Sequence, residues 1–300
     1  MSQAHESLAG REAQYNSAVG YRWACAAGTF YPADPERLRA EIIRCLGAPK
    51  EELGPPGPPL VRPVGLVLPH AGYRYSGGVA GVGFRALWPL GRPEVAVILG
   101  TNHTGLGGAI SLAEPGVWET PLGTMPIHRE LTLSIAEALG AELTDVPFVH
   151  EHSVEVQLPF LRYLYGELPF VAGVVLPLGR REAEAAGTAL AQILAKTPAV
   201  LICSTDFTHY EPHEVAKEKD LLALRYVLNL DLAGFLEVVR SRRISICGVG
   251  ALALFMATAK ALGLLSAELL AYRTSGEVAG PMDQVVGYAA ALFREVNEVA

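Results

Sequence analysis

The 300-residue sequence lacks the features that mark several large protein classes. It has only 4 cysteines and no Cys-x-x-Cys pair, so we expect no disulfide framework and a reducing cytosol suits the chain. Its 24 lysines and arginines are fewer than its 31 aspartates and glutamates, and a net charge of −7 disfavours nucleic acid or an anionic lipid surface as the main partner. Residues 1–17 are polar and lack the apolar segment of a secretory signal. We therefore expect a cytoplasmic protein.

Long hydrophobic runs and the common nucleotide-binding loops are also missing. The most apolar stretch, residues 246–265, contains Lys260 and three glycines, so it predicts a buried core helix and no membrane span. No GxxxxGK[ST] loop is present, and no GxGxxG follows an apolar run. The GxSxG turn of α/β-hydrolases is absent as well. These absences exclude the commonest phosphate-loop, dinucleotide-binding and serine-hydrolase sites.

Half of the residues are hydrophobic, and they fall into short runs that alternate with helical patterns. Asp34, Pro35 and Glu36 have the order of a helix start, and a helix is expected from Pro35. Solid apolar runs predict buried strands, and two later runs predict strands of which the second alternates like an edge strand. The expected strands are 64–68, 95–99, 170–176, 199–203, 268–274 and 284–293, and further helices are expected at 129–139, 154–164, 181–196 and 214–228.

This alternation predicts the α/β class, with a largely parallel central sheet and helices on both faces. No polar or low-complexity linker divides the core-forming runs, so we expect one domain over residues 27–300. Residues 1–26 are expected to form a flexible N-terminal tail.

Polar, reactive residues follow three of the expected strands. His70 follows the first strand, His103 follows the second, and Asp206 and His209 follow the strand at 199–203. Because ligands bind in the crevice beyond the carboxyl ends of parallel strands, these side chains are expected to converge there. A lone histidine after a strand is more often a hydrogen-bonded turn residue, but the repetition at three strand ends favours a site.

Cys247 precedes the apolar helix, where the helix dipole favours a thiolate. The alternative is a small apolar residue packed between helix and sheet. If His70, His103 and Cys247 converge, they form a three-ligand site with open positions, suited to iron(II), copper or zinc. Asp206 and His209 are then left as an oriented acid/base pair, and we predict them as catalytic residues.

Four more residues are predicted to line the substrate cleft. Tyr73 and Tyr75 follow His70 closely, although their spacing equally suits plain packing. Glu151 and His152 stand at an expected helix start, where Ser153 alternatively serves only as a cap. His150 and His152 are two apart and therefore cannot clamp one metal ion from a helix.

Seven ordered motifs resemble the Memo family, including its prokaryotic branch called AmmeMemoRadiSam system protein B. The resemblance runs from about residue 27 to the C-terminus. It implies an α/β fold similar to class III extradiol ring-cleaving dioxygenases and a redox-metal site at His70, His103 and Cys247, with Asp206 and His209 beside it. The motifs are AGTFYP (27–32), PHAGYRYSG (69–77), LGTNH (99–103), WETPLG (118–123), EHSVEVQLPFL (151–161), STDFTHY (204–210) and CGVGAL (247–252).

The sequence departs from the family pattern near two of these residues. Asn102 precedes His103 where eukaryotic members resemble Ser-His-His, and Val249 and Gly250 stand where they carry arginine and histidine. Cys247 also replaces the carboxylate of the dioxygenases. A soft thiolate shifts metal preference toward copper or zinc and is itself oxidisable, which argues against ring cleavage.

Together these observations predict a metal-binding protein, and the first hypothesis is an iron- or copper-dependent oxidoreductase acting on a small organic substrate. The alternative is a non-catalytic module that binds a peptide or a partner segment in the cleft. Zinc-assisted hydrolysis is a third hypothesis, although no glutamate base is evident. The resemblance also implies a radical SAM protein and an AMMECR-type protein as partners.

Overall fold

The computed structural model describes residues 20–296, so most of the predicted tail, residues 1–19, lies outside the described residues. Residues 20–26 are part of the fold. Strand β1 (Tyr21–Arg22) pairs in parallel with β5 (Val117–Trp118), and this small sheet is completed by β6 (Met125–Pro126). Arg22 is 2% exposed and forms a 2.6 Å ion pair with Glu155. Residues 20–26 of the predicted tail therefore belong to the fold that the structure describes.

The main sheet has the strand order β10-β12-β2-β9-β3-β8-β4-β7, with β11 also beside β12. Its four middle strands are parallel and fully buried, as their apolar runs predict. These four are β2 (Val64–Leu68), β9 (Ala199–Ser204), β3 (Val95–Thr101) and β8 (Phe170–Val175). The other strands are β4 (Ile110–Leu112), β7 (Glu142–Leu143), β10 (His209–Glu211), β11 (Ser266–Thr274) and β12 (Val285–Arg294).

The sheet as a whole is mixed: its middle strands are parallel, as expected, and antiparallel strands extend it on both sides. Strand β12 is antiparallel to β2, β11 and β10, and β4 is antiparallel to β8. The prediction that residues 284–293 form an edge strand is wrong. Because Ala289, Ala290 and Ala291 are all buried, both faces of β12 are covered, and the strand lies between β2 and β11.

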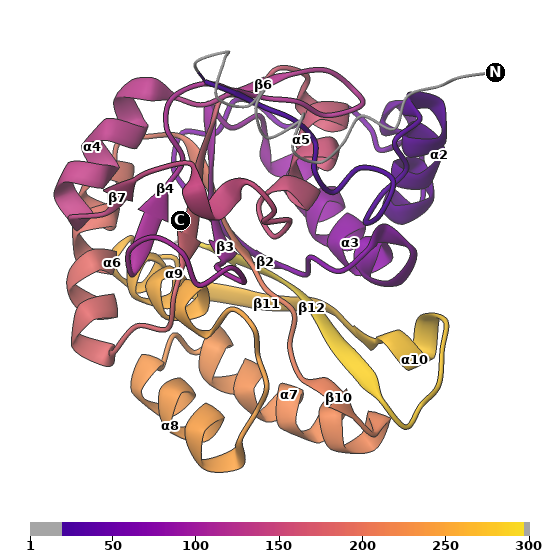
Figure 1. The fold of residues 1–300 in the computed structure, drawn as a ribbon, viewed down its shortest axis with the longest axis vertical. Helices are drawn as coiled ribbons and strands as arrows, with labels where there is room; N and C mark the ends of the chain where they lie inside the picture. Colours follow the sequence, from indigo (N-terminus) through magenta and orange to yellow (C-terminus); the bar gives the residue numbers. More distant parts are fainter. Residues whose placement is uncertain (1–19, 297–300) are drawn as a thin grey trace.

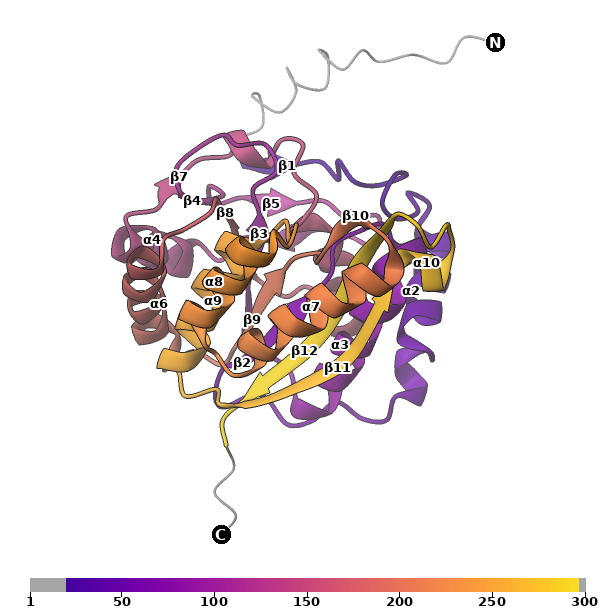
Figure 2. The ribbon, with the colours of Figure 1, turned by 90° about the horizontal axis from the view of Figure 1, so that it is seen from below.

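Helices cover both faces of the sheet, as predicted (Figure 1). Leu66 and Leu68 of β2 face the layer that contains α2, α3 and α5, whereas Val67 faces the layer of α6, α7, α8 and α9. Figure 2 shows α7, α8 and α9 in front of the sheet and α2 and α3 behind it. The helices are α2 (Pro35–Leu46), α3 (Gly78–Leu87), α4 (Arg129–Leu139), α5 (Leu158–Tyr165), α6 (Arg180–Leu194), α7 (His213–Leu228), α8 (Leu232–Arg242), α9 (Val249–Ala261) and the short α10 (Ser275–Val278).

Several helix predictions are confirmed, whereas two longer helices and the short α10 were not predicted. Asp34 caps α2 by accepting a 2.9 Å hydrogen bond from the amide of Arg37, and α9 forms the buried helix expected within residues 246–265. Helices α3 and α8 were missed. Three glycines lower the helix propensity of α3, yet a Cβ at Gly81 would lie 2.1 Å from the carbonyl oxygen of Cys45 in α2, so close packing of the two helices requires glycine there. None of the helices within residues 20–296 has both the length and the apolar character needed to cross a membrane.

Candidate metal centre

The carboxyl ends of β2, β3 and β9 bring the predicted reactive residues to one edge of the sheet. His70 follows β2 by two residues, His103 follows β3 by two, and Asp206 follows β9 by two. Cys247 stands two residues before the first residue of α9. One nitrogen of each histidine and the Cys247 sulfur all lie within 4.8 Å of one another. The structure thus brings together the three residues predicted as metal ligands.

His70 is 2% exposed, and its ring is oriented by Ser204. The Ser204 hydroxyl has one hydrogen, which it donates to the carbonyl oxygen of Ser153 at 2.6 Å, and it accepts from Gln157 Nε2 at 2.8 Å. It can therefore only accept from His70 Nδ1, which lies 3.3 Å away. In the neutral ring the hydrogen of His70 is thereby assigned to Nδ1, and Nε2 faces the Cys247 sulfur at 3.3 Å.

His103 is oriented in the same way by a carboxylate. Glu151 is 1% exposed and accepts from the His103 amide at 2.7 Å, from His103 Nδ1 at 3.0 Å and from the Ser153 amide at 2.8 Å. Burial acts to raise the pKa of Glu151, but the bonds and charge of His103 outweigh it and lower that pKa to about 2. The ionised carboxylate thus makes Nδ1 the donor, so His103 Nε2 is directed at Cys247 as well.

Cys247 is held as a thiolate by its surroundings. Burial acts to raise its pKa, but His70, hydrogen bonds from both histidines and the Thr101 hydroxyl lower it well below the ordinary value. The amide of Asp206 also donates to the sulfur, at 3.2 Å. In turn the thiolate, with other neighbours, raises the pKa of His70 to about 9 and that of His103 to about 10, against the opposing effect of burial.

Two imidazole nitrogens and one thiolate form a donor set that suits iron(II), copper or zinc and excludes magnesium and calcium. The residues fit such an ion because both Nδ1 atoms are already engaged, both Nε2 atoms face the sulfur, and the sulfur is deprotonated. Each histidine also has the outer hydrogen-bond partner that metal-bound histidines ordinarily have.

His152 completes an aromatic stack beside these ligands. Its ring lies 4.7 Å from the His103 ring and 4.1 Å from the Phe30 ring in near-parallel stacks, and 5.3 Å from the His70 ring edge-on. Burial and the two neighbouring histidines lower the pKa of His152 to about 3, so it is neutral. His152 thus packs directly beside the two histidine ligands, whereas Glu151 lies behind His103 and orients it. The alternative that Ser153 caps a helix does not apply, because its hydroxyl donates to the carbonyl oxygen of Thr101 at 2.8 Å.

The predicted acid/base pair is split by the structure. The Asp206 carboxylate accepts from the His70 amide at 2.8 Å and supports the turn that carries the ligand. Burial raises the pKa of Asp206, against the effect of His70. His209 instead lies in β10, where its ring contacts the carbonyl oxygen of Ser245 at 2.9 Å.

The two predicted cleft tyrosines lie in different surroundings. Tyr73 is 3% exposed and donates to the carbonyl oxygen of Val156 at 2.6 Å, so the packing alternative describes it. Tyr75 is 39% exposed and lines a separate surface pocket. Sequence reasoning missed Ser204 and Gln157, although both lie inside the quoted motifs STDFTHY and EHSVEVQLPFL, and their positions there were the available signal.

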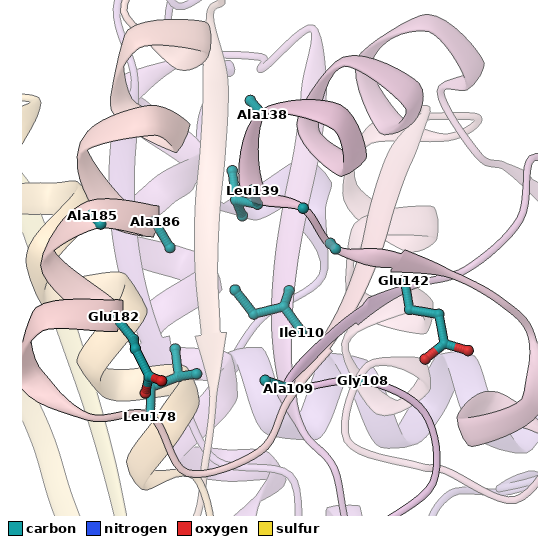
Figure 3. A pocket seen from close by; sticks show the side chains of 12 residues that line it. Gly108, Ala109, Ile110, Ala138, Leu139, Glu142, Leu178, Glu182, Ala185 and Ala186 are labelled. Carbon is teal, nitrogen blue, oxygen red and sulfur yellow. The ribbon is translucent and has the colours of Figure 1, made fainter.

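A sizeable pocket of the described residues lies away from these ligands. It has a volume of about 620 Å³ and lies between α4, α6, strand β4 and the edge strand β7 (Figure 3). Most of its lining is alanine, glycine and leucine, and Figure 3 shows Glu142 and Glu182 as its only carboxylates. It contains none of the site residues, so the site is assigned on its chemistry and not on cavity size.

Comparison with known proteins identifies the relatives of the chain. A family model described as "Memo-like protein" matches residues 22–292. The MEMO1 family protein MK0963 of Methanopyrus kandleri is 44% identical over 277 residues, which cover 89% of this chain and 97% of that protein. The MEMO1 family protein PAE0818 of Pyrobaculum aerophilum is 40% identical over 278 residues, covering 89% and 96%.

A solved structure supports the fold. The crystal structure of the uncharacterized protein JW3007 from Escherichia coli K12 aligns with a TM-score of 0.51 at 13% identity, over 76% of this chain and 98% of that one. At this identity the likeness concerns the fold alone. It agrees with a single α/β domain, the class that the extradiol dioxygenase-like resemblance implied.

Proposed function

The chain belongs to the Memo family, and we propose that it is a metal-dependent oxidoreductase whose iron(II) or copper ion is held by His70, His103 and Cys247. The observation that carries the proposal is the convergence of one nitrogen of each histidine and the thiolate within 4.8 Å. Such an ion would supply redox chemistry and open positions for dioxygen and a small organic substrate.

The protein's contribution is to prepare the three donor atoms. Ser204 and Glu151 keep the Nδ1 hydrogens in place, so each Nε2 is presented toward the shared centre. The amide of Asp206 and the Thr101 hydroxyl stabilise negative charge on the Cys247 sulfur. The three side chains are already oriented and the sulfur is already deprotonated, so little rearrangement is needed when a metal ion binds. Each histidine, whose pKa the thiolate raises, would release its Nε2 hydrogen as the ion binds.

In this proposal His209 moves protons and His152 contacts the substrate. His152 is neutral and stacked between Phe30 and His103, so it can exchange hydrogen bonds with a substrate but holds a proton poorly. His209 is only partly buried, and its Nδ1 contacts the carbonyl oxygen of Ser245. Its other ring nitrogen is therefore left to accept or release a proton.

Metal analysis of protein purified without added metal tests the proposed site. The Cys247→Ala and His70→Ala variants are expected to lose bound iron or copper, whereas Cys45→Ala, a buried cysteine of α2, is expected to retain it. Equal metal content in the parent and the three variants would show that Cys247 and His70 do not bind the metal ion.

Oxygen uptake tests the proposed reaction. Metal-loaded protein should consume oxygen with at least one member of a panel of catechols and reductants, and His209→Ala should lower that rate while metal content stays constant. No uptake with any member, together with peptide binding that is insensitive to chelators, would favour the non-catalytic alternative. Zinc as the retained metal would favour hydrolysis.

A further inference from the structure

A second, smaller pocket lies away from the metal ligands, where three parts of the chain that are distant in the sequence meet. It has a volume of about 320 Å³ and is bordered by the end of α2, the π-helical turn η2 (Tyr73–Gly77) with the start of α3, strand β11, and α10. Its lining comprises Arg44, Arg74, Tyr75, Gly78, Val79, Val82, Ala271, Arg273, Glu277 and Val278.

Three of these residues are arginines, and their guanidinium groups are incompletely paired. Nε and Nη2 of Arg44 hold the Glu41 carboxylate at 3.0 and 2.6 Å, which leaves Nη1 without a recorded acceptor among residues 20–296. The guanidinium of Arg74 lies 5.8 Å from the centre of the Tyr75 ring and has no recorded carboxylate partner in the same part of the chain. The side chain of Arg273 makes no hydrogen bond or ion pair with residues 20–296.

The acidic residue of the lining does not neutralise these groups. Oε2 of Glu277 accepts from the amide of Thr274 at 2.8 Å and so caps the start of α10. No ion pair joins Glu277 to an arginine within the described residues. Counting Glu41 as the partner of Arg44, the pocket retains an excess of positive charge in a chain whose net charge is −7. An unpaired guanidinium presents a planar fork of donors that matches a carboxylate or a phosphate.

The rest of the pocket is apolar. Val79 is 3% exposed, and Val82 and Ala271 are partly buried beside it. A volume of about 320 Å³ is at the small end of the range for ligand pockets, so the site takes a compact molecule. An apolar surface next to unpaired cations fits a ligand with one anionic head and a short hydrocarbon or aromatic body.

We propose that this pocket binds a small organic anion, a phosphate monoester or a carboxylate, whose charged group is held by Arg74 and Arg273 and whose apolar body lies on Val79, Val82 and Ala271. Arg44, which is hydrogen-bonded to Glu41, is the third cationic residue that lines the pocket. The site is distinct from the metal centre and does not depend on the proposed oxidoreductase activity.

Calorimetric titration of the full chain with hexyl phosphate and with hexanoate tests the proposal. At least one of the two is expected to bind, and the comparison shows which anionic group the site takes. Inorganic phosphate and hexanol, which each lack one half of the proposed ligand, should bind at least 10-fold more weakly than that probe. A chelator is present throughout, and the Cys247→Ala variant is titrated in parallel, so that binding at the metal centre is excluded.

Variants then locate the site. Loss of a charged hydrogen bond weakens binding about 10-fold or more, so Arg74→Gln/Arg273→Gln is expected to show at least that loss. Arg181→Gln, an exposed arginine of α6 outside the pocket, is the matched control and should bind like the parent. Parent-like binding by the double variant, equal binding of hexanol, or no binding of either anionic probe would overturn the proposal.

Discussion

Replacing Glu151 by glutamine tests whether metal binding depends on the orientation of the His103 ring and not only on the presence of that histidine. The carboxylate accepts hydrogen bonds from the His103 amide, from His103 Nδ1 and from the Ser153 amide, at 2.7, 3.0 and 2.8 Å. Glutamine is almost isosteric with glutamate but offers one accepting oxygen and one donating NH2 group. If that NH2 group faces Nδ1, the histidine must accept there, and its hydrogen moves to Nε2, the atom that faces Cys247.

The expected loss of metal affinity follows from the known effect of removing a hydrogen-bond partner behind a metal-bound histidine. Mutating the carboxylate behind a metal-bound histidine ordinarily costs about 10- to 100-fold in metal affinity, or about 1.4 to 2.7 kcal/mol. We therefore expect Glu151→Gln to bind zinc, used as a diamagnetic probe, at least 10-fold more weakly than the parent. Glu142→Gln, on edge strand β7, is the matched control and should be unchanged.

Two measurements check this reasoning. Competition with a chromogenic chelator gives the zinc affinity. Nitrogen-15 NMR of the histidine rings, recorded above pH 10 where the His103 ring is neutral, reports which ring nitrogen of His103 carries hydrogen. A purely structural role for Glu151 would lower the thermal unfolding temperature without moving the hydrogen between the two nitrogens. Unchanged affinity together with an Nδ1-protonated His103 in Glu151→Gln would refute the assignment of Glu151 as a positioning residue.

Three further predictions concern stability and the site. Burial raises the pKa of the Asp220 carboxyl from 3.8 to about 6, so the native state binds a proton there more tightly than the unfolded state does. The resulting stabilisation of the native state is complete below pH 4 and is lost as the pH rises through 6. The loss in the free energy of unfolding is about 3 kcal/mol. Urea unfolding at pH 4 and pH 7 should show this fall for the parent and a smaller fall for Asp220→Asn; equal falls would contradict it. Arg22→Ala leaves Glu155 buried without its 2.6 Å partner and should lower the free energy of unfolding by about 3 to 5 kcal/mol in urea titrations, and a loss under 1 kcal/mol would be inconsistent with a buried pair. Gly248→Ala places a Cβ 2.5 Å from the Thr205 hydroxyl oxygen, so metal content should fall while the far-ultraviolet spectrum is kept, and full metal content would show that the turn adapts.

The elements that the sequence predicted best are the strands that are buried on both faces. The apolar runs of β2, β3, β8 and β9 are covered on both faces, and hydrophobic periodicity reports burial directly. Strand β12 was misplaced because its alternating pattern is typical of an edge, while small alanines allow it to be covered by other elements on both sides. Helix α3 was missed because its glycines serve packing against α2, a property of the pair of helices and not of either alone.

The sequence by itself determined which residues are candidates for a metal site, since imidazole, thiol and carboxylate groups directly after strands or before a helix are visible along the chain. Only the tertiary structure decided their roles. Glu151 orients His103, Ser204 orients His70, and Tyr73 packs in the core, because a hydrogen bond depends on distances of about 3 Å between groups that can be more than a hundred residues apart. Local patterns report what a side chain can do, whereas the fold sets which atom it faces.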